Sequence, residues 1–145
     1  MRTTTILLLG IWAIGADAPQ VPADKELDSL QGEWHAVTFE ANGESVSTAK
    51  AGWKVIVKGK KVSVRFGAVS FDGNLVLGTA GKERRLDVVE TRWGETPVQM
   101  QLTGIYKLEQ CKLTVCDRFG SHAPPAEFRT TSGSTTMIQV FKQSK

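Results

Sequence analysis

The chain has 145 residues, of which 41% are hydrophobic and 23% charged, and its formal net charge is +3. This length fits one domain that can bury a sizeable core. A nucleic-acid surface needs basic residues interleaved with aromatic platforms, whereas the basic clusters here, in residues 58–61 and 82–85, fall in predicted turns. We therefore expect no nucleic-acid partner.

The first residues have the pattern of a secretory signal peptide. Arg2 supplies a positive start, residues 6–15 are apolar, and Ala16-Asp17-Ala18 has the A-x-A form of a cleavage site. Pro19 disfavours cleavage directly before it, so a slightly earlier cut and an uncleaved anchor are the alternatives. The apolar stretch falls well short of the roughly 20 residues that a membrane-spanning helix needs. We predict that residues 1–18 are a cleaved signal and that the mature chain is exported, without a transmembrane segment.

A short linker and a brief helix precede the main domain. Residues 19–26 are assigned to the linker and residues 27–145 to the domain. The helix is expected over residues 25–30, where Asp24 can accept hydrogen bonds at its start. Gly32 fits the position after the end of a helix, because a residue without Cβ readily adopts a positive φ.

From Gly32 onward the hydrophobic period changes to two, which is typical of strands. Asn42-Gly43 and Asp72-Gly73 are the turn pairs of tight hairpins. The predicted strands cover residues 34–41, 53–58, 62–66, 69–71, 75–77, 85–90, 98–108, 113–116 and 136–141. Since they follow one another through mostly short connections, we predict an all-β fold: a small antiparallel up-and-down β-barrel of about eight strands, whose closure removes exposed edges.

The alternation places bulky side chains inside this barrel. An eight-stranded barrel is just wide enough for side chains or one small ligand, so we expect a mostly filled interior with a small cavity. Gly32 and Trp34 are predicted to have structural roles. The predicted ligand-binding lining consists of Trp53, Val55, Phe66, Met100, Leu102 and Tyr106.

The residues with reactive side chains form no recognisable site. Across an extended strand, Cys111 and Cys116 would lie roughly 16 Å apart, against about 5.5 Å between bridged Cα atoms, so we predict two free thiols. Their spacing to His122 matches no familiar zinc motif. Cys116 has no evident basic partner, and no pair of carboxylates is placed for glycoside hydrolysis. We predict no catalytic residue, no metal and no cofactor.

Four short segments carry a resemblance to a known family: Leu30-Gln31-Gly32-Glu33-Trp34, Gly104-Ile105-Tyr106-Lys107-Leu108, the strand that ends at Cys116, and Pro125-Ala126-Glu127-Phe128. With these segments, residues 27–142 resemble the uncharacterised lipocalin-like domain that occurs in many paralogous copies in planctomycete bacteria. Where members of that family often have an Asp-Gly-Asp turn, this chain has Glu109-Gln110-Cys111.

The resemblance implies a lipocalin-like fold and an exported protein, and it brings no established activity or cofactor. It also implies that Trp34 closes one end of the barrel, with its ring inside and its N–H on a nearby carbonyl. A basic side chain from a late strand, Arg129 or Lys142, would then cover the ring.

One stretch, residues 117–135, is long for a strand connection and can be interpreted in two ways. Long loops in compact domains are often functional, but a proline-stiffened connection with Phe128 anchored in the core is the simpler interpretation. The leading functional hypothesis is an exported barrel that binds a small hydrophobic or amphipathic molecule. The alternatives are a cell-envelope structural or protein-interaction module with a filled barrel, and an enzyme, which the sequence supports least.

Overall fold

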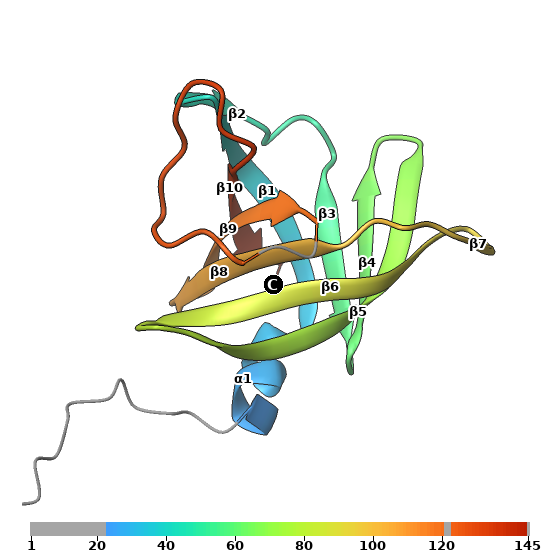
Figure 1. Cartoon of the computed structure of the whole chain (residues 1–145). Coiled ribbons are helices and arrows are strands. Elements are labelled where there is room, and N and C mark those ends of the chain that lie inside the picture. Colours follow the sequence, from blue (N-terminus) through green and yellow to red (C-terminus); the bar gives the residue numbers. More distant parts are fainter. Residues whose placement is uncertain (1–22, 121–122, 145) are drawn as a thin grey trace, which may run out of the picture.

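The computed structural model describes residues 23–120 and 123–144, and its strands form one antiparallel sheet. Helix α1 (Ala23–Leu30) precedes the strands (Figure 1). The strands are β1 (Gly32–Ala41), β2 (Glu44–Ser47), β3 (Lys54–Lys58), β4 (Lys61–Phe66), β5 (Val69–Ala80), β6 (Glu83–Trp93), β7 (Thr96–Pro97), β8 (Leu102–Glu109), β9 (Lys112–Phe119) and β10 (Met137–Gln143).

Eight of these strands close into a barrel, in the order β1, β3, β4, β5, β6, β8, β9 and β10, because β10 pairs back onto β1. The short strands β2 and β7 extend the hairpins that follow β1 and β6. The predicted all-β, lipocalin-like up-and-down barrel with a short N-terminal helix is therefore confirmed. The predicted turn at Asn42-Gly43 is also confirmed, since both residues have a positive φ, 54° and 77°.

The two ends of the barrel differ. At one end, here called the helical end, α1 lies below the sheet, β1 begins and β10 finishes (Figure 1). At the opposite end, here called the far end, the β4–β5 and β6–β7 hairpins turn and β9 finishes.

The helical end is sealed by contacts between α1 and the barrel. Trp34 is completely buried, and its Nε1 donates to the carbonyl of Leu30 at 2.9 Å. The hydroxyl of Tyr106 donates to the carboxylate of Glu26, which also pairs with Arg84 at 3.0 Å. Glu26 lies in the helix that was expected over residues 25–30, and its carboxylate ties this helix to the barrel wall. The helix also begins at Ala23, earlier than the expected start.

Trp34 lies inside the barrel, where the resemblance places it, but the expected basic residue does not cover its ring. Lys142 pairs with His35 in the ladder between β10 and β1 and is exposed, as His35 is. A cation–π contact is instead made on the outside, with Lys107 Nζ 4.9 Å from the ring centre of Phe128. The indole of Trp34 instead contacts α1 at its edge, where Nε1 donates to the carbonyl of Leu30.

The predicted hairpin at Asp72-Gly73 is wrong, because β5 runs without interruption from Val69 to Ala80. The chain turns earlier, so that Phe66 pairs with Val69. A Cβ on Gly73 would come within 2.6 Å of Val88 Cγ1. The glycine therefore permits a close approach of β5 and β6 and is not a turn residue.

The predicted strand over residues 98–108 is also too long, since β8 starts at Leu102. The cause lies in β6, where Glu90 has a φ of 51° and the register to β5 shifts. Beyond this bulge, the hydroxyl of Thr91 donates to the carbonyls of Val98, at 3.0 Å, and of Met100. Residues 98–101 are thus held by the Thr91 side chain and by isolated backbone hydrogen bonds, and not by a regular ladder.

Residues 123–136, which precede β10, contact the outer face of β8 and β9. Cys116 points out of the barrel but is completely buried, and its Sγ lies 3.5 Å from the carbonyl of Glu127. Thr130 Oγ1 accepts a hydrogen bond from the amide of Gly43 at 3.0 Å. Phe128 lies under Lys107 on this outer face, so its expected place in the core is wrong.

Gly104 is the position where an added methyl group should cost most. Its Cβ would lie 2.6 Å from both Asp117 Cβ and the carbonyl oxygen of Cys116 on the neighbouring strand. Overpacking of this kind typically destabilises by about 1–3 kcal/mol, so Gly104→Ala should lower the unfolding free energy by at least that much in denaturant titrations. Gly78→Ala is the matched control, because nothing lies within 4 Å of its Cβ position in β5. An equal effect of both variants would contradict this packing argument.

Candidate functional site

The side chains predicted to line a ligand cavity are mostly engaged with one another and with the core. Tyr106 is buried at the helical end, and Val55 and Leu102 are partly buried against the core cluster. Trp53 packs on Phe66, with ring centres 5.4 Å apart. It also packs on Phe39 and Phe141, at 5.6 and 6.1 Å.

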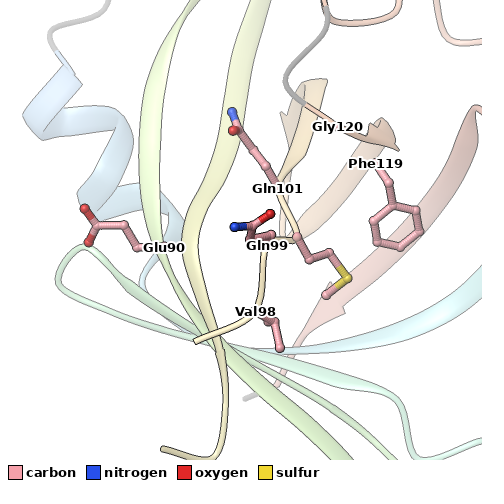
Figure 2. A pocket seen from close by; sticks show the side chains of 7 residues that line it. Glu90, Val98, Gln99, Gln101, Phe119 and Gly120 are labelled. Atoms are coloured by element: carbon pink, nitrogen blue, oxygen red, sulfur yellow. The ribbon is translucent and has the colours of Figure 1, made fainter. Parts of the chain in front are cut away.

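A pocket of about 670 Å³ lies at the far end of the barrel, and we call it the rim pocket. Its apolar lining comes from Val98, Met100 and Phe119. The remaining lining residues are Glu90, Gln99, Gln101 and Gly120. Figure 2 shows Glu90 and Phe119 on opposite sides of the segment that carries Gln99 and Gln101. Of the six predicted lining residues, Met100 is the one that lines this pocket.

Backbone hydrogen bonds hold the walls of the rim pocket in place. The amide of Gly120 donates to the carbonyl of Gln101 at 2.7 Å, and that of Val98 donates to Thr91 at 2.9 Å. Phe119 ends β9, pairs with Leu102 and is 53% exposed. An exposed aromatic ring beside amide side chains can bind an apolar group and orient a polar one.

A buried carboxyl group lies deeper in the barrel on the same strand face as Phe119. Asp117 is buried and accepts a hydrogen bond from Gln139 Nε2 at 3.1 Å. Burial raises the pKa of Asp117 to about 7, although the hydrogen bond from Gln139 opposes the shift. Gly104 faces Asp117 across the ladder, and a Cβ there would collide with it. The lack of a side chain at Gly104 therefore leaves the space that the Asp117 side chain occupies.

The cysteines are free, as predicted, with Cys111 exposed and Cys116 buried. Burial raises the pKa of the Cys116 thiol to about 11. Since the thiolate is the nucleophile, this side chain is unsuited to nucleophilic catalysis at neutral pH. His122, considered with the cysteines as a metal ligand, lies outside the described residues. Within residues 23–120 and 123–144, no three His, Cys, Asp or Glu side chains gather where they could hold a metal ion.

Comparisons with known proteins give no relative. No family model, curated protein or solved structure matches the chain. Among the described residues, no helix has the length and apolar character required to cross a membrane.

Proposed function

We propose that this protein is an exported lipocalin-like barrel that binds a small hydrophobic or amphipathic molecule in the rim pocket. The observation that carries the proposal is the pocket itself, whose volume of about 670 Å³ lies within the usual range of roughly 300–1,000 Å³ for ligand sites. Val98, Met100 and Phe119 supply its apolar surface, and the amides of Gln99 and Gln101 can orient a polar group. The ligand thus sits at the far end and not among the core side chains.

Binding of the neutral fluorophore N-phenyl-1-naphthylamine tests this proposal. Its emission should rise on binding, and Phe119→Ser should weaken its affinity about tenfold, since burial against a phenyl ring contributes on the order of 1.5–3 kcal/mol. Val76→Ser is the matched control, because Val76 is 49% exposed and does not line the rim pocket. Equal affinities for the two variants, or no binding to the parent protein, would overturn the proposal.

Export and family membership belong to the same proposal. The positive φ of Gly32, 112°, and the complete burial of Trp34 give the residues that carry the family resemblance clear structural roles. Amino-terminal sequencing of the protein secreted from a bacterial host should show cleavage within residues 15–19, next to the Ala16-Asp17-Ala18 pattern. An intact amino terminus on the exported protein would favour an uncleaved anchor.

A second candidate function is a protein-interaction module of the cell envelope. The observation that favours it is the exposure of apolar side chains on the two far-end hairpins: Phe66 is 49% exposed, Val69 41% and Trp93 52%. Exposed apolar groups that gather on one surface often mark an interaction site. Native mass spectrometry after incubation with a lipid extract separates the candidates. An added mass of a few hundred daltons supports ligand binding, and an unchanged mass favours the module.

A further inference from the structure

A second hollow of about 720 Å³ lies on the outer face of the barrel, and we call it the outer groove. It shares Glu90 and Val98 with the rim pocket, so the two hollows meet at these residues. Unlike the rim pocket, it is lined mainly by polar side chains from β4, β5 and β6. These are Lys61, Ser63, Asp72, Asn74, Glu90 and Arg92.

The polar groups of the outer groove are held by hydrogen bonds between neighbouring strands. Ser63 Oγ donates to Asp72 Oδ1 at 2.6 Å. Asn74 Nδ2 donates to Glu90 Oε2 at 2.6 Å. Each hydrogen bond uses one carboxylate oxygen, Oδ1 of Asp72 or Oε2 of Glu90. The second oxygen of each carboxylate can therefore accept a hydrogen bond from a ligand.

The charges that line the outer groove determine which kind of polar ligand group it can bind. Asp72 and Glu90 supply two negative charges, and Lys61 and Arg92 supply two positive charges. No salt bridge within the described part of the chain involves either of these two bases. A phosphate or sulfate would face two carboxylates, and a quaternary ammonium would face two cations. Hydroxyl groups both donate and accept, so a neutral group with several hydroxyls matches this alternation best.

Glu90 has an unusual backbone conformation at the junction of the two hollows. Its φ of 51° is left-handed, which is uncommon for a residue other than glycine, asparagine or aspartate. Such conformations cost on the order of 1–3 kcal/mol and gather at functional sites. The β6 bulge thereby brings a carboxylate to the point where the polar and the apolar hollow join.

We propose that the ligand is an amphiphile with a sugar or other polyol head. Its apolar chain lies against Met100 and Phe119 in the rim pocket, and its hydroxyls bind Asp72 and Glu90 in the outer groove. This inference rests on the proposed function, because it names the class of ligand for the rim pocket.

The test compares n-octyl β-D-glucoside with sodium octyl sulfate, both kept monomeric, since their chains are identical and only their heads differ. The glucoside should bind about tenfold more tightly, because hydrogen bonds to charged groups are among the stronger ones. Glu90→Gln and Asp72→Asn should each weaken glucoside binding about tenfold and leave octyl sulfate binding equal or stronger. Glu109→Gln is the matched control and should change neither, because Glu109 is exposed at the end of β8, at the helical end.

The outcomes separate this inference from the proposed function. If both amphiphiles bind equally and neither carboxylate variant matters, the polyol head is overturned, whereas Phe119-dependent binding of N-phenyl-1-naphthylamine still supports the rim pocket. If D-glucose alone binds as tightly as the glucoside, the site takes a free sugar and the amphiphile is overturned. Retained thermal melting of Asp72→Asn and Glu90→Gln excludes misfolding as the cause of weaker binding.

Discussion

The Asp117→Asn variant should be more stable than the parent protein at pH 8 and about equally stable at pH 4. In the folded protein, burial raises the pKa of Asp117 from its ordinary 3.8 to about 7. The folded state therefore binds a proton more tightly than the unfolded chain does. This contribution to stability is fully present below pH 4, declines as the pH rises toward 7, and is absent above it.

The expected size of the effect is large. A difference of about three pKa units corresponds to roughly 4 kcal/mol, so the advantage of Asp117→Asn at pH 8 should be several kcal/mol. Asparagine has nearly the same shape and stays neutral, and its carbonyl can still accept the hydrogen bond from Gln139. Urea titrations of both proteins from pH 4 to 8 measure the difference. Parallel stability curves would show that Asp117 is not a buried acid.

The Trp34→Ala variant should lose about 3–5 kcal/mol of unfolding free energy, which is typical for removal of a buried aromatic side chain. Trp34 is completely buried, and its Nε1 bonds the carbonyl that ends α1. The substitution opens a cavity and releases the helix that seals this end. A loss of this size approaches the whole stability of an ordinary domain.

The control for Trp34→Ala is Trp93→Ala. Trp93 is the same residue type but is 52% exposed at the far end, so its removal should change stability by less than about 0.5 kcal/mol. Guanidinium titrations monitored by far-ultraviolet circular dichroism give both values. Similar losses for the two variants would mean that Trp34 does not seal the barrel.

The strands that follow simple alternation could be predicted from the sequence, and those shaped by close packing could not. Residues 62–66 alternate cleanly, and β4 contains them. Residues 34–41 lie in β1, although its register to β10 shifts between Ala36 and Thr38. The pair Asp72-Gly73 predicts a turn, but the glycine is needed for the close approach of Val88 on the neighbouring strand. A local sequence pattern does not reveal such a contact. The break at residues 98–101 depends on Thr91 and the β6 bulge, which alternation does not show either.

The candidate site was missed for a related reason. The predicted strand ended at Cys116, whereas β9 continues to Phe119. Leu113, Val115, Asp117 and Phe119 keep the same alternation, and this signal could have placed Phe119 at the far end. Asp117 interrupts the apolar pattern on the inner face, so the sequence indicates that the strand ends before it. A buried carboxyl group is rare unless it has a partner, and the partner here, Gln139, lies on another strand.

The most direct test of ligand binding at the far end is a titration of the ¹⁵N-labelled protein with N-phenyl-1-naphthylamine, followed by backbone amide shifts. The account predicts the largest shifts at Glu90, residues 98–101 and residues 119–120, with α1 unaffected. Shifts centred on α1 and Tyr106, or none at all, would contradict it.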